Sequence, residues 1–157
     1  MRKILNSKLN NVKINIGWRE WIYFPDYDNF KLKAKIDSGA RTSALHATHI
    51  REFEKEGEQW VRFCVYQSRQ YIYVERPVIR NAIIKNSFGE SQKRPLILLK
   101  IKLGNNSWET VISLTQRSGM TYPMLIGRNT LKKKHLIHPK RSFVLNKKLN
   151  SEHINSI

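Results

Sequence analysis

Residues 34–42 of this chain read AKIDSGART, and the interpretation of the whole sequence starts from this stretch. Apolar residues alternate with lysines from position 30 to position 36, which is the period of a strand with one buried face. That strand leads into Asp37, a hydroxyl residue and two small residues. Backbone N–H groups of a loop can hold such a carboxylate in one orientation, and Gly39 lets a second backbone approach it. Asp37, Ser38 and Gly39 are therefore candidate catalytic residues.

A second short motif, LIGRN, occupies residues 125–129. Two apolar residues precede its glycine, and the following residues to Lys134 predict a helix of about two turns that begins near Arg128. Neither motif is specific by itself, because Asp-Ser-Gly is a common turn sequence. The two motifs together, in this order, are much more specific.

The pair of motifs resembles that of the retropepsins, which include the retroviral proteases. Those enzymes carry Asp-Thr/Ser-Gly-Ala and later a hydrophobic-hydrophobic-Gly-Arg-Asn segment. The resemblance implies that the later strand passes beside the catalytic loop and that its glycine, Gly127 here, leaves room for the crossing. The residues that support the site are then Leu125, Ile126, Gly127, Arg128 and Asn129. The residues assigned to substrate binding are Ala40, Arg41 and Thr42.

A longer set of motifs is similar to a bacterial family labelled "ATP-dependent zinc protease", which is also described as retropepsin-like. Some members of that family occur with ATP-grasp ligases that add glutamate to proteins. The similarity extends from about residue 17 to residue 145. Its motifs are GWREW (17–21), KIDSGARTSALHA (35–47), WVRF (60–63), LTQR (114–117), MLIGR (124–128) and PKRS (139–142).

One position departs from the retroviral pattern. Retroviral proteases have an acid directly after Asp-Thr-Gly-Ala, and it pairs with the arginine of Gly-Arg-Asn. This chain has Arg41 at that position, so Arg128 needs another partner. A cation at this position favours a substrate that carries carboxylates.

The zinc in the family label has no motif in this sequence. A zincin needs His-Glu-x-x-His on a helix, and none is present. The pairs His46/His49 and His135/His138 lie in expected strands, where residues i and i+3 point to opposite faces. A site composed of His46, His135 and Asp37 stays open as an alternative. No phosphate-binding glycine loop is present either, so we expect no metal and no cofactor.

The fold class that these patterns predict is all-β: a small closed, retropepsin-like β-barrel with one short C-terminal helix. We expect an N-terminal extension at residues 1–15, a peptidase domain at 16–146 and a frayed basic tail at 147–157. A polar loop is expected at 86–94. The expected strands cover residues 12–24, 30–37, 45–53, 60–66, 71–84 (with a bend at Pro77), 96–103, 107–114, 124–126, 135–138 and 142–145.

The charge of the chain is unusual, with 29 Lys and Arg against 12 Asp and Glu, a net charge of +17. Such a field attracts polyanions, among them acidic peptides and nucleic acid. Nucleic acid is the less favoured partner, since the four tryptophans are read as core or interface residues. The chain lacks an apolar run long enough for a membrane helix or a signal peptide, which predicts a cytoplasmic protein without membrane contact. The single cysteine, Cys64, is read as a core residue.

The function predicted from these residues is that of an aspartic endopeptidase. Such an enzyme needs two carboxylates about 3 Å apart. This chain supplies one Asp-Ser-Gly, so we expect a homodimer with two Asp37 residues on its axis. The substrate is a peptide or protein, with acidic or glutamate-rich chains preferred. The alternatives are a non-catalytic basic barrel that binds an acidic polymer or nucleic acid, a zinc peptidase, and a nucleophile at Ser43 assisted by His46.

Overall fold

The computed structural model describes residues 12–85, 88–116 and 121–145. Most of them lie in β-strands, and no helix among them reaches 7 residues. The elements in chain order are β1 (Ile14–Phe24), η1 (Pro25–Tyr27, a 3-10 helix), β2 (Phe30–Ile36), β3 (Ser43–His46), β4 (Thr48–Lys55), β5 (Glu58–Gln67), β6 (Gln70–Lys85), β7 (Ser91–Leu103), β8 (Asn106–Thr115), β9 (Met124–Ile126) and β10 (His135–Ser142).

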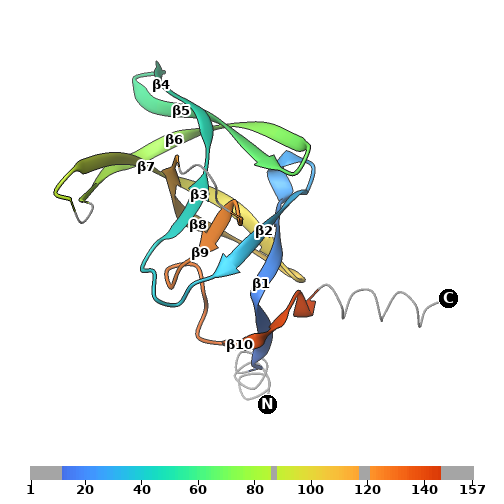
Figure 1. Cartoon of the computed structure of the whole chain (residues 1–157). Coiled ribbons are helices and arrows are strands. Elements are labelled where there is room, and N and C mark those ends of the chain that lie inside the picture. The colour runs from blue at the N-terminus through green and yellow to red at the C-terminus, as the bar shows by residue number, and fades with distance from the viewer. Residues whose placement is uncertain (1–11, 86–87, 117–120, 146–157) are drawn as a thin grey trace, which may run out of the picture.

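Six of the strands close into a barrel in the order β1-β2-β9-β3-β8-β7. The barrel closes where β7 returns to β1, with Tyr23 paired to Lys102. β10 adds to the outside of β1 in parallel, and β6, β5 and β4 continue the sheet beyond β7 (Figure 1). The predicted all-β class with a closed barrel is confirmed. Closure leaves the barrel strands without free edges, so their backbone groups are paired.

The barrel interior is filled by the apolar faces of its strands. The alternation predicted for β2 is confirmed, since Leu32 and Ala34 are fully buried while Lys31 and Lys35 are exposed. Burying a leucine side chain such as that of Leu32 contributes about 1.5–3 kcal/mol. Other large and fully buried side chains of the core are Phe24, Phe63, Ile16, Ile22, Leu45, Ile97, Ile101, Ile112 and Met124.

β6 is long because it belongs to two parts of the sheet. Its first half pairs with β5 and its second half with β7, and the register shifts between Val78 and Arg80. Pro77 lies at this change of partner, where the sequence predicts a bend. β4, β5 and the first half of β6 therefore form a separate three-stranded layer beside the barrel mouth (Figure 1).

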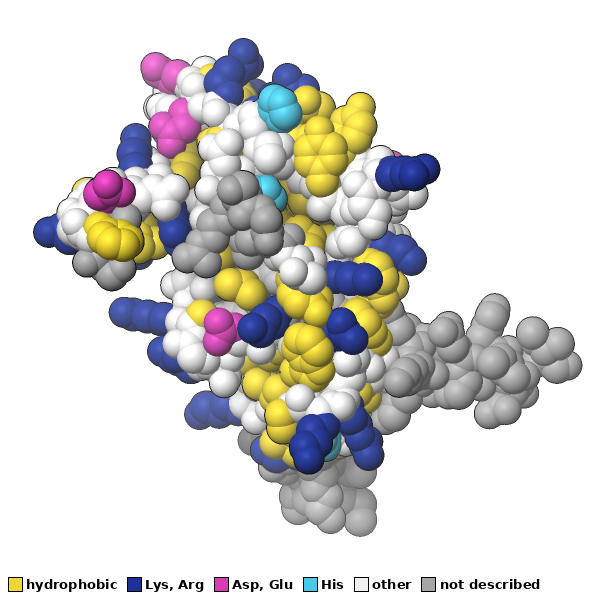
Figure 2. Space-filling model, in the orientation of Figure 1, with side chains coloured by type: hydrophobic (Ala, Val, Ile, Leu, Met, Phe, Trp, Pro, Cys, Tyr) yellow, Lys and Arg dark blue, Asp and Glu magenta, His cyan; other side chains and the backbone are white. Residues whose placement is uncertain are grey.

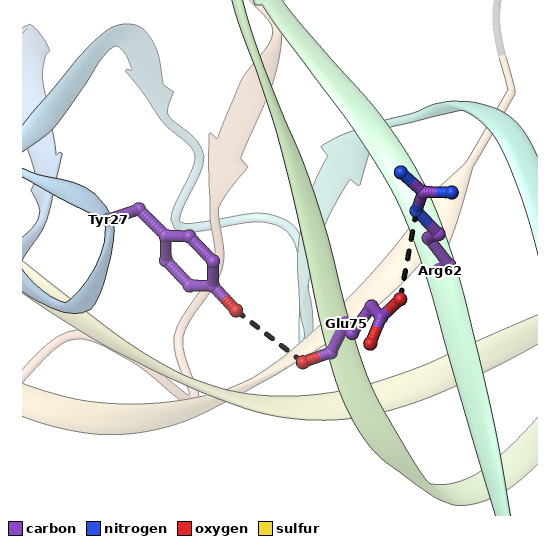
Figure 3. A network of polar contacts seen from close by, with 3 residues as sticks. All are labelled: Tyr27, Arg62 and Glu75. Atoms are coloured by element: carbon purple, nitrogen blue, oxygen red, sulfur yellow. Dashed lines mark hydrogen bonds and ion pairs between the residues drawn. The ribbon is translucent and has the colours of Figure 1, made fainter.

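A small polar network ties this outer layer to the turn between β1 and β2. The Tyr27 hydroxyl of η1 donates to the Glu75 carbonyl at 3.4 Å, and the Glu75 carboxylate lies 3.7 Å from the Arg62 Nε (Figure 3). Burial raises the pKa of the Tyr27 phenol, which keeps the hydroxyl protonated as a donor. η1, β5 and β6 are thereby held against one another.

The helix predicted to begin near Arg128 is not formed. Residues 128–130 form a turn, and β10 starts at His135. The Arg128 and Asn129 N–H groups donate to the carbonyls of Ala40 and Arg41, a loop far away in the sequence. Helix starts leave such N–H groups free for other partners. Here they anchor a neighbouring loop.

Two other expectations are corrected. The polar loop predicted at 86–94 is shorter, because Ser91–Arg94 pair with β6 as a two-stranded ribbon; its solvent-exposed strands carry polar residues. Residues 142–145 are not a separate strand, because β10 runs to Ser142 and the N–H groups of Val144 and Leu145 donate to Glu20 instead.

The predicted extension at 1–15 and tail at 147–157 lie almost wholly outside the described residues. The domain boundaries therefore stay predictions. Among the described residues, none forms a helix that is long and apolar enough to cross a membrane.

Glu20 on β1 is a carboxylate in the barrel wall that is fully buried. Its Oε2 accepts the N–H of Gly17 at 2.6 Å and of Val144 at 3.1 Å, and its Oε1 accepts that of Leu145 at 3.3 Å. Burial raises the pKa of Glu20, partly offset by these three N–H donors. The carboxylate therefore clasps the chain after β10 onto β1.

We expect Glu20→Gln to destabilise the protein by about 1–3 kcal/mol at pH 7, because an amide NH₂ cannot accept a hydrogen bond from a converging donor. Because the pKa is raised in the folded state, native Glu20 contributes stability that falls as pH rises above 4.5. The variant loses this pH dependence. Urea unfolding at pH 5 and 7 measures both effects, with the exposed Glu54→Gln as the control. Equal stability of the two variants would contradict the role of Glu20 in holding the chain after β10 against β1.

Candidate active site

Asp37 lies directly after β2, in a loop whose backbone is tied down at several points. Its N–H donates to the Ile126 carbonyl at 2.9 Å, and its carbonyl accepts the Ala40 N–H at 3.2 Å. The carboxylate Oδ1 accepts the Gly39 N–H at 3.0 Å. One carboxylate oxygen is thus oriented by the loop itself, as predicted, while the half-exposed side chain stays accessible.

β9 explains why this loop has a defined place. The strand lies between β2, with which it runs parallel, and β3, with which it runs antiparallel. Its end, Gly127, is buried against the backbone that leads into β3. A Cβ on Gly127 would lie 2.7 Å from the Thr42 carbonyl carbon and 2.9 Å from the Ser43 nitrogen. The structure therefore has the close crossing that the retropepsin resemblance implies.

Arg128 has a partner that the sequence alone does not reveal. Its Nη1 donates to the Ser38 carbonyl at 2.9 Å and to the Gly39 carbonyl at 3.1 Å. The place of the acid that pairs with this arginine in retroviral proteases is taken by two backbone carbonyls of the Asp37 loop. Arg41 is exposed, and its side chain makes no hydrogen bond or ion pair with the described residues.

Beneath the loop lies a buried cluster of hydroxyl groups that sequence reasoning missed. Ser43 Oγ accepts the Gly127 N–H at 2.9 Å and also contacts the Thr130 hydroxyl, which lies 2.7 Å from that of Thr110. Asn129 joins the cluster, since its Oδ1 accepts the Ser43 N–H at 2.9 Å and its Nδ2 donates to a β8 carbonyl. The sequence could have indicated this cluster only through the residue types, since each member has a hydroxyl or amide side chain in or next to a strand with apolar residues.

The same cluster decides against Ser43 as a nucleophile. Ser43 is fully buried, with its hydroxyl engaged by Gly127 and Thr130. His46 lies three residues further along β3, where strand geometry places its side chain on the other face. Ser43 is a structural residue of the site.

A cavity of about 250 Å³ opens beside the Asp37 loop. Loop, barrel and hairpin all contribute to its walls. Its lining residues are Ala40 and Thr42 of the loop, Ala44 of β3, Ser113 and Thr115 of β8, Leu125 of β9, and Ile84 and Arg94 of the β6–β7 hairpin. Two of the three residues predicted to bind substrate, Ala40 and Thr42, line this cavity, and Arg41 does not.

The cavity continues along the β6–β7 hairpin. A second depression shares Ile84 and Arg94 with the first, and a third shares Gln92 with the second. The third reaches β4, where Lys93 Nζ lies 3.5 Å from Glu52 Oε2. Ser113 and Thr115 of β8 line the first cavity, whereas Leu114 and Gln116 line the third depression, so the third lies on the other face of the sheet. The groove beside the Asp37 loop therefore consists of the first cavity and the second depression, along one face of the β6–β7 hairpin.

The composite metal site left open from the sequence does not assemble. The described residues contain no group of three or more His, Cys, Asp and Glu that could hold a metal ion. His135 stacks on Trp108, and its Nδ1 accepts the Lys132 N–H at 2.9 Å. Burial, aided by Lys134 and Lys132, lowers the pKa of this imidazole. His135 thus completes the turn before β10.

A family model described as "Retropepsin-like aspartic endopeptidase RimB" matches residues 15–148. The family resemblance drawn from the motifs is thereby confirmed. A solved structure of a Legionella pneumophila protein of unknown function is similar with a TM-score of 0.72 and 31% identity, over 83% of this chain and 97% of that one.

Curated relatives carry a different name. The chain is 44% identical over 144 residues to a probable alpha-L-glutamate ligase of Shewanella pealeana, and 39% identical over 128 residues to one of Desulfotalea psychrophila. These alignments cover 89% and 79% of this chain, but only 31% and 28% of the relatives. The chain spans less than a third of the curated relatives it matches.

We expect Arg128→Gln to loosen the Asp37 loop, because it removes the guanidinium that holds the Ser38 and Gly39 carbonyls. Amide hydrogen exchange of residues 38–41 should accelerate, with a loss of about 1 kcal/mol in stability. Arg41→Gln is the matched control, since it removes an exposed guanidinium from the same loop. Equal exchange rates in the two variants would refute the role of Arg128.

Proposed function

Because this chain belongs to the RimB-like family of retropepsin-like aspartic endopeptidases, we propose that it hydrolyses peptide bonds with Asp37 as its catalytic residue. The observation that carries the proposal is the restraint of the Asp37 loop. The Gly39 N–H orients the Asp37 carboxylate, and Arg128 binds the carbonyls of the loop. The close packing of Gly127 against Thr42 and Ser43 fixes the end of the loop that leads into β3. Such pre-organisation is what catalysis by a carboxylate requires.

The proposed enzyme is a homodimer, because one subunit supplies one Asp-Ser-Gly loop. A twofold axis beside Asp37 places two carboxylates about 3 Å apart, as aspartic peptidases need. Exposure of Ser38 and Gly39 supports this arrangement, since those residues are available to face a second subunit. Ser38 then fixes the two loops to each other, and Gly39 leaves room for substrate backbone.

The chemistry of such a pair follows from the repulsion of like charges. Two carboxylates this close share one proton. The ionised carboxylate takes a proton from a water held between them, and that water attacks the scissile carbonyl carbon. The protonated carboxyl donates to the carbonyl oxygen as it becomes negative. The first carboxyl then passes the proton that it took from water to the amide nitrogen, and the C–N bond breaks. A hydroxyl on the tetrahedral carbon gives its proton to the second carboxylate as the carboxylic acid product forms, which restores the pair with one shared proton.

We assign the role of substrate cover to the β6–β7 hairpin. Ile84 and Arg94 of this hairpin face Ala40 and Thr42 across the cavity. Near its tip, Ile83 and Phe88 are 74% and 88% exposed, which is unusual for large apolar side chains. A bound peptide, or the second hairpin of a dimer, buries these side chains and excludes water from the cleaved bond.

Acidic protein segments are the proposed substrates. The groove bears Arg94 and Glu90, Arg41 is exposed at the loop, and the chain carries a net charge of +17. The relatives named probable alpha-L-glutamate ligase point to the same chemistry, because glutamate added to a protein makes an acidic segment. Ligase activity itself is not part of the proposal, since the chain matches less than a third of those proteins.

We expect Asp37→Asn to abolish peptide hydrolysis while leaving the fold intact. The asparagine Oδ1 can still accept the Gly39 N–H, but an amide cannot act as the base. Mixing the variant in equal amount with native protein should remove about half of the activity per native subunit, because mixed dimers are inactive. Full activity of the purified variant would move the chemistry to other residues. Unchanged activity in the mixture would contradict the shared site.

We also expect kcat/KM to be higher for an acidic peptide than for a matched neutral one, and to fall as salt rises. Exposed charges are screened beyond about 8 Å at physiological ionic strength, so the preference is a low-salt effect. Arg41→Gln should reduce it, whereas Arg69→Gln, in the distant β5–β6 turn, should reduce it less. Equal kcat/KM for both peptides at low salt would rule out acidic selectivity without touching the assignment of Asp37.

A further inference from the structure

The outer face of β1 and β2 carries aromatic rings and cations in register. The two strands pair Arg19 with Lys35, Trp21 with Lys33, and Tyr23 with Lys31. Residues between these positions on β1, such as Ile22, are fully buried, so the paired side chains point away from the barrel. A face of this composition contributes nothing to the core.

The cations of this face lie over the rings. Lys31 Nζ is 4.8 Å and Lys33 Nζ 5.4 Å from the centre of the Trp21 ring. The Phe143 ring stacks against Trp21 at 5.8 Å and has the Arg19 guanidinium at 5.1 Å. None of these three cations, nor Lys35, makes an ion pair with a described carboxylate. Their charge is therefore uncompensated.

The surface extends onto the outer layer of the fold. Gln67, next to the β5–β6 turn, accepts the Lys33 N–H at 2.8 Å, where β2 runs beyond its pairing with β9. Three tyrosines flank this turn: Tyr66, Tyr71 and Tyr73 are 42%, 56% and 43% exposed. Their rings contact one another at 5.4 and 6.1 Å, and Arg62 lies 4.4 Å above Tyr73.

We call this surface, from Trp21 and the β2 lysines to the three tyrosines, the cation–aromatic stripe. Figure 2 shows hydrophobic side chains interleaved with Lys and Arg over β1 and β2, and a further group of hydrophobic side chains at the upper right, over the β5–β6 turn. Asp and Glu gather mostly at the upper left of this face, away from the stripe.

We propose that the cation–aromatic stripe binds single-stranded nucleic acid. Phosphates pair with unpaired lysines and arginines, and unstacked bases stack on exposed rings. An acidic polypeptide uses the cations equally well but gains nothing from the rings, whose faces are themselves electronegative. The regular alternation of rings and cations fits a ligand that alternates planar bases with phosphates. Of the two roles predicted for Trp21 from the sequence, core or interface, its outward position on β1 favours the interface.

The proposal is independent of the assignment of Asp37, because the stripe shares no residue with the groove. The probes are fluorescein-labelled 12-mers of uridine RNA and of thymidine DNA, with a 12-base-pair duplex and a glutamate 12-mer as competitors. Binding to the full chain carrying Asp37→Asn is followed by fluorescence anisotropy over a salt series. The RNA and DNA arms separate the two sources of single strands.

Substitutions test the rings and the cations separately. Tyr71→Ser and Trp21→Leu should each weaken binding about tenfold through lost stacking, whereas Phe88→Ser, an exposed ring elsewhere, should not. Lys31→Gln should weaken binding and reduce its salt dependence, more than Lys85→Gln, which removes the same charge from the β6–β7 hairpin. Circular dichroism of each variant shows whether it is folded, and Tyr71→Ser is the surface change least able to disturb the fold.

Three results would overturn the proposal. The first is the absence of binding to either single strand at 100 mM salt. Another is an unchanged affinity of both ring variants for the single strands, together with a glutamate 12-mer that displaces the probe as well as an unlabelled single strand does. This result would make the stripe a surface for acidic polypeptides. The last is an equal loss in Lys31→Gln and Lys85→Gln, which would make the attraction a property of net charge alone.

Discussion

The crossing of Gly127 against the backbone of Thr42 and Ser43 is the constraint on which the rest of the structure depends. The backbone of Thr42 and Ser43 lies within 3 Å of the position that a Cβ on residue 127 would occupy. Because Gly127 has no Cβ, β9 can lie between β2 and β3. Without it, β9 could not complete the barrel, and the N–H of Asp37 would lose its carbonyl partner at Ile126. The same contact therefore closes the barrel and positions the Asp37 carboxylate.

A close crossing buries polar backbone, and the neighbouring side chains satisfy it. Ser43, Thr130 and Asn129 supply hydroxyl and amide groups where strand pairing cannot reach, and Arg128 does the same at the surface. Each of these bonds is modest in water, but leaving a buried group unpaired costs about 1–3 kcal/mol. Glu20, inside β1, does the same for the N–H groups of Gly17, Val144 and Leu145. Hydrogen bonds from side chains therefore help to hold the loops of this fold in place.

Charged side chains inside the barrel and on its outer face differ in the partners that they have. Inside the barrel, Glu20 accepts hydrogen bonds from three N–H groups, whereas the cations on the outer face of β1 and β2 make no ion pair with a described carboxylate. The groove beside Asp37 and the cation–aromatic stripe are thus separate basic surfaces. Aromatic rings distinguish them: the groove is lined by small, hydroxyl and aliphatic side chains and by Arg94, while the stripe presents Trp21 and the tyrosines.

The all-β class, most strands and the two motifs of the site could be predicted from the sequence, because a period of two and a specific residue pair are local signals. The partner of Arg128, the burial of Ser43 and the turn in place of the helix after Gly127 could not. These depend on which distant backbone comes near, and no local pattern encodes that. The place of the β6–β7 hairpin beside Asp37 also depends on tertiary structure, since it follows from the bend of β6.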